Sequence, residues 1–337
     1  MQLINGSGKQ DRVNFRKLLR KYGIKGLRAQ AMLPPEAQEA IDSAVTRVGR
    51  QRLTVVNALL DANLRRPINN WWGVTKLSRD AVSESGHAKM TMVPKARGER
   101  QAADRDRYSV PVPCQWDDFS FNIREIEAAD RAGIDLDTTH IEQATRNTNE
   151  LIEHVAIHGW KDANGDAIKI DGLELPGLLD STMRSANTAD RTMDDAAHTG
   201  GDILADLQRR TEVARAAGFY GPFDWFLPSN LTVRMNDDFK TNTDKSLLAR
   251  LRELEYGGRP VNIRFADMLP DDTDLLIQMT SDVVEASVGQ TPTPVTWEDG
   301  PGFEEFGVVL ACVIVRVFPN YLGNYGVVVG TPDGEPV

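Results

Sequence analysis

Histidine and acidic side chains are the first candidates for chemistry in this sequence. His154 and His158 are four residues apart, and Glu153 lies beside them. On a helix this spacing puts both imidazoles on one face, where a histidine pair can bind zinc. The chain nevertheless lacks the HExxH order, and no third ligand is evident nearby. We therefore favour a polar or interface role for the two histidines.

Residues 160–166 (WKDANGD) are a second candidate, because acidic or amide groups stand at alternate positions as at the start of a calcium loop. The glutamate that would complete the loop is missing, since Gly172 stands near its place and Glu174 is out of register. We therefore favour a simple turn. The nucleophile-elbow, phosphate-loop and GxGxxG motifs are also absent. Because no nucleophile, base and electrophile can be grouped, we expect no catalytic residue, no cofactor and no metal.

The two cysteines, Cys114 and Cys312, are 198 positions apart and match no metal-ligand spacing. Each lies in an apolar stretch typical of a strand. This context predicts that both thiols are buried and reduced, as in a protein from a reducing cytoplasm.

Composition excludes several classes of protein. Of the 337 residues, 41% are hydrophobic and 26% charged, which is typical of a globular chain. No apolar run reaches the roughly 18 residues of a membrane helix, and residues 1–15 lack the apolar core of a secretory signal. The net charge of −10 is uneven, with a balance of +11 over residues 1–107 and −21 over residues 108–337. Such asymmetry predicts a basic region with its own partner, or subunits that pair basic with acidic surface.

The basic excess begins in residues 9–28, which hold eight basic residues and one acidic residue. A solvated basic helix and an arm that touches phosphate or an acidic neighbour both fit this pattern, since contact with phosphate needs only charge density. The basic residues of this candidate arm are Lys9, Arg12, Arg16, Lys17, Arg20, Lys21, Lys25 and Arg28.

Residues 67–113 are too polar to bury a core of their own. We expect short strands at 74–77 and 88–93 around a turn at 83–86, followed by a charged stretch from 95 to 107 with hardly any large apolar side chain. A two-stranded hairpin is marginal in water, so the pattern predicts a long arm that lies on something else. The basic residues of this loop are Lys76, Lys89, Lys95, Arg97, Arg100, Arg105 and Arg107.

A helix of about 30 Å is predicted over residues 138–159. Thr138 or Thr139 provides an N-cap and Gly159 a left-handed C-cap. The opposite, polar face carries Glu142, Arg146, Asn149 and Glu153. The apolar stripe that we expect in the core consists of Ile141, Ala144, Thr148, Leu151, Ile152 and Val155.

Beyond residue 159, short helices alternate with short apolar strands, which indicates a layered α/β unit. Residues 306–318 (FGVVLACVIVRVF) form a long apolar strand pattern with a single charge, Arg316, so both of its faces should be covered. We expect the predicted long helix to pack on this strand, and residues 320–329 to add an edge strand.

This order of parts resembles the major capsid protein fold of tailed bacteriophages, the HK-ninety-seven type, which encapsulin shells share. Residues 108–113 (YSVPVP) with 119–126 (FSFNIREI) resemble the strand that leads into the family's peripheral domain. Residues 221–230 (GPFDWFLPSN) resemble a strand and helix of its axial domain, and residues 280–318 its closing strands. The long helix resembles the family's spine helix. The resemblance covers roughly residues 35–335.

The resemblance implies an α+β fold with an N-terminal arm, an extended β-hairpin loop, a peripheral domain with a spine helix and an α/β axial domain. The implied parts are the arm and helices at 1–66, the extended loop at 67–113, the peripheral domain at 114–170 and 286–337 with its spine at 138–159, and the axial domain at 171–285.

The resemblance also implies a structural protein and not an enzyme. Copies of the chain would form pentamers and hexamers of an icosahedral shell around double-stranded DNA, contacted without sequence specificity. The shell would be a virion capsid assembled in the cytoplasm of a host bacterium, with scaffolding, portal or decoration proteins as further partners and no membrane. An encapsulin-type compartment around a cargo enzyme is the alternative, and a soluble hydrolase is a third class that a monomeric protein would favour.

Overall fold

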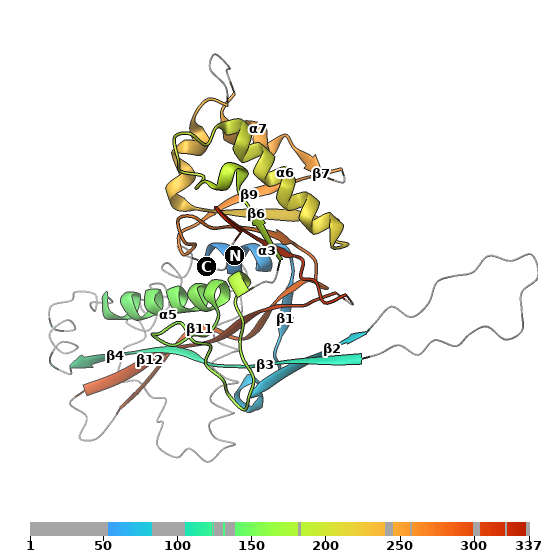
Figure 1. Ribbon diagram of the computed structural model, residues 1–337. Helices are drawn as coiled ribbons and strands as arrows, with labels where there is room; N and C mark the ends of the chain where they lie inside the picture. The colour runs from blue at the N-terminus through green and yellow to red at the C-terminus, as the bar shows by residue number, and fades with distance from the viewer. Residues whose placement is uncertain are drawn as a thin grey trace, which may run out of the picture.

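A four-stranded sheet beneath a long helix, a five-stranded sheet with its own helices, and an extended two-stranded hairpin make up the protein (Figure 1). The computed structural model describes residues 53–82, 105–122, 124, 131, 139–180, 183–239, 245–256, 258–298, 304–320 and 322–334. Within these residues, no helix combines the length and apolar character needed to cross a bilayer.

The predicted spine helix is α5, Thr139–His158. It begins within one residue of the predicted N-cap and ends before Gly159, whose φ of +79° is a left-handed conformation that glycine adopts without a steric penalty. A side chain at Gly159 would also press on the backbone of Gly177, 2.7 Å from the Cβ position. The end of α5 is therefore fixed by a local cap and by a close approach of two backbone segments.

The buried face of α5 is broader than its apolar stripe predicts. Five of the expected core residues are buried, namely Ile141, Ala144, Thr148, Ile152 and Val155. The sixth, Leu151, is 44% exposed, so its assignment to the core was wrong. Asn149 and Glu153, which the sequence placed on the polar face opposite the stripe, are buried as well.

The neighbours of α5 explain these differences. The helix packs on one side on the strands β4 (Gln115–Asn122) and β12 (Glu304–Val317), and it also packs against α3 (Thr54–Asp61). A second contact widens the buried arc toward the side of Glu153, and Leu151 lies just beyond the opposite edge of that arc. Periodicity reports which face is apolar, but the number of packed neighbours decides how far burial extends.

Glu153 has a structural task that its charge did not reveal. The residue before α3, Leu53, has no side-chain acceptor for the free N–H groups at the helix start. The Glu153 carboxylate takes that place, accepting from the Val55 N–H at 2.6 Å and the Val56 N–H at 3.2 Å. Burial raises the pKa of Glu153 to about 7, although these hydrogen bonds oppose the shift.

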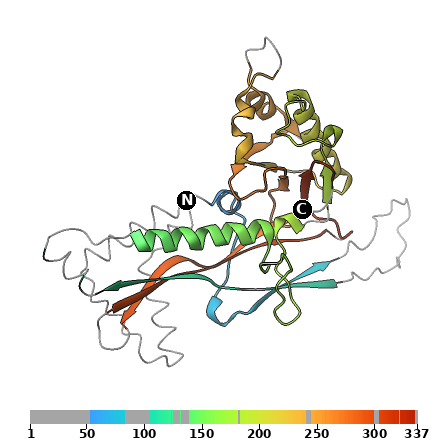
Figure 2. The ribbon, with the colours of Figure 1, turned by 60° about the vertical axis from the view of Figure 1, so that its left-hand side comes forward.

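The four-stranded sheet has the order β1-β11-β12-β4. Its strands are β1 (Arg65–Pro67), β11 (Val284–Glu298), β12 (Glu304–Val317) and β4 (Gln115–Asn122). The spine helix runs along this sheet in both views (Figures 1 and 2). The predicted contact between the spine and the closing strand is therefore confirmed. Arg316, the one charged residue of the predicted stretch 306–318, is buried and forms an ion pair with its cross-strand partner Glu285.

The five-stranded sheet has the order β5-β13-β10-β6-β9. Its strands are β5 (Met183–Ala186), β13 (Val327–Thr331), β10 (Asp274–Gln278), β6 (Phe223–Pro228) and β9 (Asn262–Ala266). Helices α6 (Gly200–Ala216) and α7 (Leu247–Arg252) and the ribbon β7 (Glu255–Tyr256) and β8 (Arg259–Pro260) belong to the same part of the chain (Figure 1). This arrangement confirms the layered α/β unit.

Residues 320–329 were expected to add an edge strand, but the strand found there, β13, is an interior strand of its sheet. β13 lies between β5 and β10, and all five of its residues are buried. The remaining short elements are the 3-10 turns η1 (Trp71–Gly73), η2 (Leu178–Asp180), η3 (Thr188–Asp190), η4 (Ser229–Thr232) and η5 (Arg234–Asn236).

The hairpin consists of β2 (Lys76–Val82) and β3 (Arg105–Pro111), which are antiparallel and form a two-stranded sheet separate from the two larger sheets (Figure 1). The expected strand at 88–93 and the turn at 83–86 lie outside the described residues, and the partner of residues 76–82 is the segment 105–111. This register places Leu77 opposite Val110, and both pack against the buried cluster of Val155, Leu175 and Ile314. Burial of these apolar side chains at the root explains the register, which the polar sequence between the strands did not reveal.

Candidate functional site

The histidine pair of the spine helix lies on its surface. The rings of His154 and His158 are stacked, with centroids 4.6 Å apart, and the His158 Nε2 lies 3.2 Å from the backbone oxygen of Met268. Partial burial and the neighbouring charges of His158 and Lys161 lower the pKa of His154. In the part of the chain that the structure describes, no group of three or more His, Cys, Asp or Glu side chains is placed to hold a metal ion. The pair is thus a stacked, partly exposed surface feature.

The candidate calcium loop is a tight turn. Asp162 Oδ1 accepts hydrogen bonds from the backbone N–H groups of Asn164 and Asp166, both at 2.9 Å. Lys161 and Ala167 close the turn as a β-bridge. The carboxylate that would have led a metal loop is therefore engaged with the backbone, as is usual for Asp in turns.

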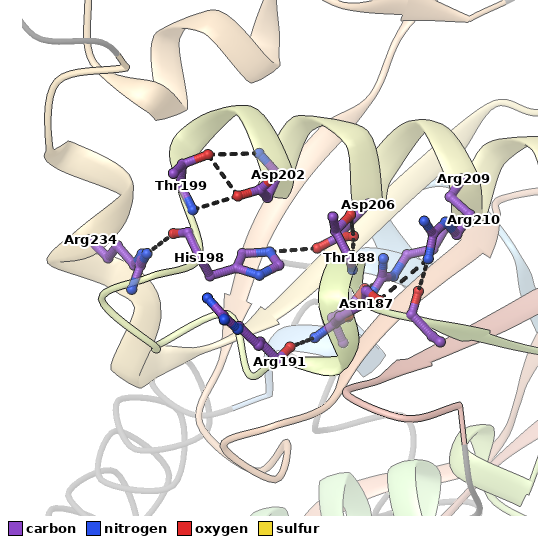
Figure 3. Close-up of polar contacts among 12 residues, drawn as sticks. Asn187, Thr188, Arg191, His198, Thr199, Asp202, Asp206, Arg209, Arg210 and Arg234 are labelled. Carbon is purple, nitrogen blue, oxygen red and sulfur yellow. Dashed lines mark hydrogen bonds and ion pairs between the residues drawn. The ribbon is translucent and has the colours of Figure 1, made fainter.

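A buried polar cluster lies where helix α6 meets the five-stranded sheet (Figure 3). Thr199 caps α6 and forms a capping box with Asp202. One turn further, Asp206 is fully buried and accepts from the His198 ring at 2.8 Å and from the backbone and hydroxyl of Thr188, both at 2.7 Å. This carboxylate joins the start of α6 to the turn η3.

A histidine, an aspartate and a hydroxyl within contact distance invite comparison with a catalytic triad. The order of contacts is different, because the Thr188 hydroxyl donates to Asp206 and not to His198. His198 is also only 1% exposed. A nucleophile must contact its base and reach a substrate, so this cluster serves packing and not acyl transfer.

The second half of the cluster is a buried ion pair. Arg210 of α6, which is fully buried, places its Nε 2.6 Å from a carboxylate oxygen of Asp274 on β10, and Trp225 on β6 donates to the same oxygen at 2.6 Å. Burial raises the pKa of Asp274, and the Arg210 guanidinium counteracts this shift. A Cβ at Gly330 of β13 would collide with both charged groups, so only glycine fits there. The ion pair joins α6 to β10, and its Asp274 carboxylate also accepts from Trp225 on β6.

A cavity of about 500 Å³ adjoins this cluster at the N-terminus of α6. Its wall includes Arg234, which donates to the backbone oxygen of His198, together with Asp194, Asp237 and Asp238. Val233, also on the wall, is 77% exposed. The mixture of opposite charges and one exposed apolar side chain is typical of a polar contact rim and gives no ligand chemistry.

The hairpin is firmly attached at its root. Arg79 donates to the backbone oxygen of Ser281 at 2.9 Å and lies 4.0 Å from the centre of the Phe318 ring. Ser78 and Ser109 hydrogen-bond across the two strands at 2.8 Å. The hairpin therefore leaves the body in a defined direction.

The outer part of the hairpin is exposed. Arg107 bonds to its cross-strand neighbour Asp80 at 2.9 Å, which lowers the pKa of Asp80, and both side chains are exposed, as are Lys76 and Arg105. The other basic loop residues of the prediction, Lys89, Lys95, Arg97 and Arg100, lie outside the described residues, and so do all eight basic residues of the arm. The structure thus brings three of the expected loop residues, Lys76, Arg105 and Arg107, onto one ribbon.

Large apolar side chains are exposed at several separate places. On the four-stranded sheet and its surroundings they are Trp72, Trp116, Leu151 and Ile170; on the hairpin, Tyr108; and toward the five-stranded sheet, Tyr220, Val233 and Leu322. Exposed aromatic groups are enriched where proteins contact one another. Sequence reasoning singled out few of these residues, because exposure is decided by tertiary packing.

Three solved structures of similar fold are a virus-like particle from Pyrococcus furiosus, the capsid of Myoviridae phage XM1 and the capsid of an empty GTA particle. The first has a TM-score of 0.60 at 15% identity, covering 86% of this chain and 98% of that chain. The second has a TM-score of 0.60 at 13% identity, covering 83% and 93%. The third has a TM-score of 0.54 at 15% identity, covering 84% and 91%. No curated protein matches the sequence.

The similarity establishes the expected α+β fold, with its spine helix and its projecting hairpin. It extends over most of the chain and over nearly the full length of each of the three structures. A family model described as a family of unknown function, DUF6260, matches residues 28–296. The chain therefore belongs to the family DUF6260 and has the major capsid protein fold of tailed bacteriophages, which encapsulin-type particles share.

Proposed function

We propose that this chain is the structural subunit of the icosahedral capsid of a tailed bacteriophage. Copies form pentamers and hexamers that enclose double-stranded DNA, and the protein resides in the virion after assembly in the bacterial cytoplasm. The role is structural and not enzymatic, and scaffolding, portal and decoration proteins are its further partners. The capsid of phage XM1 has the same fold and supports this proposal.

The projecting hairpin is the observation that carries the proposal. Beyond its root, Asp80, Arg105, Arg107 and Tyr108 are exposed, and β2 and β3 pair only with each other within the described residues. An isolated two-stranded ribbon is marginal in water. A neighbouring subunit that receives the hairpin would bury this surface, and repetition of that contact around a symmetry axis leads to a closed ring.

The division of the chain belongs to the same proposal. We assign the arm and first helices to residues 1–66, the extended loop to 67–113, the peripheral domain to 114–170 and 286–337, and the axial domain to 171–285. The last strand, β13 at Val327–Thr331, is an interior strand of the five-stranded sheet, so this strand departs from the division and belongs with the axial domain. The axial domain would surround the centre of each capsomer.

Deletion of the hairpin tests the proposal. Replacing residues 76–107 by a short Gly-Ser linker removes the ribbon but leaves both sheets and α5. We expect the wild-type protein to form closed shells in electron micrographs and the deletion variant to give folded, smaller species by light scattering, with unchanged helical content by circular dichroism. Closed shells from the deletion variant would refute the role of the hairpin. A monomeric wild-type protein would refute the shell itself.

The alternative is an encapsulin-type compartment that packages a cargo enzyme. The fold supports this alternative as well as it supports the capsid, because the virus-like particle from Pyrococcus furiosus and the phage XM1 capsid have the same TM-score of 0.60. The contents of purified shells distinguish the two. Nuclease-protected DNA and a high ratio of absorbance at 260 to 280 nm would support the capsid. Small, uniform, DNA-free particles with one co-purifying enzyme would support the compartment.

A further inference from the structure

Cys114 and Cys312 lie opposite one another on neighbouring strands. The last residues paired between β4 and β12 are Gln115 and Ala311. One further step along this antiparallel register places Cys114 opposite Cys312, and each thiol shifts the pKa of the other. Two residues that are 198 positions apart, and that are the only cysteines in the chain, thus lie opposite one another at the end of the β4–β12 pairing.

The end of the strand pairing defines the geometry of this pair. Val313 would next face Pro113, which has no N–H to offer. The side chain of Gln115 fills the gap, donating to the Val313 oxygen at 3.0 Å and accepting from its N–H at 3.2 Å. Because these groups of Val313 point toward β4, the N–H and C=O of Cys312 point away from it.

Cys114 and Cys312 are therefore a non-hydrogen-bonded pair of the β-ladder, which means that their backbone N–H and C=O groups do not bond to each other. In such pairs the Cα atoms are about 4.5 Å apart and the side chains approach most closely. A disulfide spans Cα distances of about 4.4–6.8 Å, so the backbone already satisfies its main requirement. The bond would form without a change of register.

The two thiols differ in exposure and in pKa, the two properties that decide which thiol attacks a disulfide first. Cys114 is exposed, whereas Cys312 is buried beside Trp71, so the expectation that both are buried was wrong for Cys114. The hydrogen bond from Cys312 lowers the pKa of Cys114 to about 7, while the pKa of Cys312 is raised. Cys114 is thus an accessible, partly ionised nucleophile, and Cys312 a protected partner.

We propose that Cys114 and Cys312 close into a reversible intrachain disulfide when the protein meets a small-molecule disulfide. The Cys114 thiolate attacks one sulfur of the oxidant, breaks its S–S bond and releases one thiolate. Cys312 then loses its proton to solvent and attacks the Cys114 sulfur, releasing the second thiolate. The protein loses two electrons and two protons, and one disulfide is reduced to two thiols.

The bond would join the hairpin root to the centre of the sheet. β4 follows β3 directly in the chain, and β12 is an interior strand of the four-stranded sheet. Closing a long loop of chain restricts the unfolded state more than the folded state, so the bond should stabilise the subunit. The inference does not depend on shell assembly.

Treatment of the full-length protein with glutathione disulfide at pH 8 tests this inference. We expect both thiols to disappear from a thiol titration, the mass to fall by two hydrogens, and a peptide map to join the segments around residues 114 and 312. The melting temperature should rise by roughly 5–10 °C and return on reduction. The rate should fall by about tenfold one pH unit below the pKa of Cys114, since only the thiolate attacks.

Two single variants serve as controls. Cys114→Ser and Cys312→Ala should each show no oxidant-dependent change in melting temperature, and Cys312→Ala should stop at a glutathione adduct on Cys114. In the wild-type protein, a lasting adduct on Cys114 beside a free Cys312 thiol would overturn the proposal. A disulfide between two chains on a non-reducing gel, with no intrachain bond, would overturn it too.

Discussion

Glu153 shows at the scale of one residue how a charged side chain is used as a structural acceptor. Its carboxylate caps α3 from a helix almost 100 residues away and lies in a site that is 1% exposed. The positive end of a helix favours a carboxylate there, but burial costs more than these contacts return, so the pKa rises to about 7.

The raised pKa predicts a specific pH dependence. The folded state holds the proton of Glu153 more tightly than the unfolded state, where the pKa is near 4.5. The contribution of protonated Glu153 to the unfolding free energy is therefore fully present below pH 4.5 and is lost as the pH rises through 7. Relative to Glu153→Gln, which does not titrate, wild-type stability should fall by roughly 2–4 kcal/mol between pH 4.5 and pH 8. Urea unfolding of both proteins measures this, and parallel pH profiles would contradict it.

The ion pair of Arg210 and Asp274 gives a second prediction at this scale. Arg210→Met leaves the Asp274 carboxylate buried without its cation, which should cost about 3–5 kcal/mol in unfolding free energy. The neighbour Arg209 is exposed and donates only to backbone oxygens, at 3.1 and 3.3 Å, so Arg209→Met should cost about 1 kcal/mol. Denaturant unfolding compares them; equal losses would show that the ion pair does not anchor α6.

At the scale of elements, the spine helix α5 connects the parts of the molecule. It contacts the four-stranded sheet and helix α3, and its C-terminal turn reaches Met268 through His158. The sequence predicted its bounds within one residue because caps and periodicity act locally. It did not predict the width of the buried arc, because that depends on α3 and on a contact made by Glu153.

Two adjacent positions on α5 distinguish a buried side chain from an exposed one. Ile152 is 1% exposed and Leu151 is 44% exposed. Ile152→Asp buries an unpaired charge and should cost more than about 4 kcal/mol, or prevent folding. Leu151→Asp should cost less than about 1 kcal/mol by thermal unfolding. A severe loss with Leu151→Asp would mean that this side chain is buried in the assembled protein, and measurement on dissociated subunits would show whether it is.

The sequence of the hairpin predicted that a two-stranded arm exists but did not identify its second strand. Its polarity predicted an arm that lies on something else, and within the described residues β2 and β3 pair only with each other. Residues 105–111 were not predicted as the partner of β2, because the stretch from 95 to 107 is charged and has hardly any large apolar side chain. Register was decided by Leu77 and Val110 at the root, where the strands meet the sheet.

At the scale of the whole molecule, charge is divided along the chain. Residues 1–107 carry +11 and the remainder −21. In the proposed shell, the basic arm at residues 9–28 contacts packaged DNA or an acidic neighbour, and the acidic remainder keeps the bulk surface from binding nucleic acid. These arm residues lie outside the described part of the structure, so the contact is a prediction from the sequence.

Neutralising the arm tests this prediction. Replacing its eight basic residues by Gln should weaken non-specific binding to duplex DNA and reduce the salt slope of the binding constant by up to about 7. Replacing only the four lysines of the arm, Lys9, Lys17, Lys21 and Lys25, by Arg keeps the charge and should leave binding unchanged. Fluorescence anisotropy across salt concentrations measures both. An unaltered slope in the Gln variant would assign the arm to a protein neighbour.

The sequence alone determined the local features of this protein. The bounds of α5, the long apolar strand β12 and the polar hairpin follow from caps, period and composition, which act over a few residues. These features in this order were enough to indicate the fold, because each one restricts what its neighbours in the chain can do.

Only the tertiary structure decided which distant groups meet. The burial of Glu153, the contact between Cys114 and Cys312 and the pairing of Arg210 with Asp274 each join positions at least 64 residues apart. No local pattern marks such partners, because a side chain's environment is set by whatever packs against it. Burial, pKa and reactivity in this protein therefore arise from the packing of α5, α6 and β12 on their neighbours.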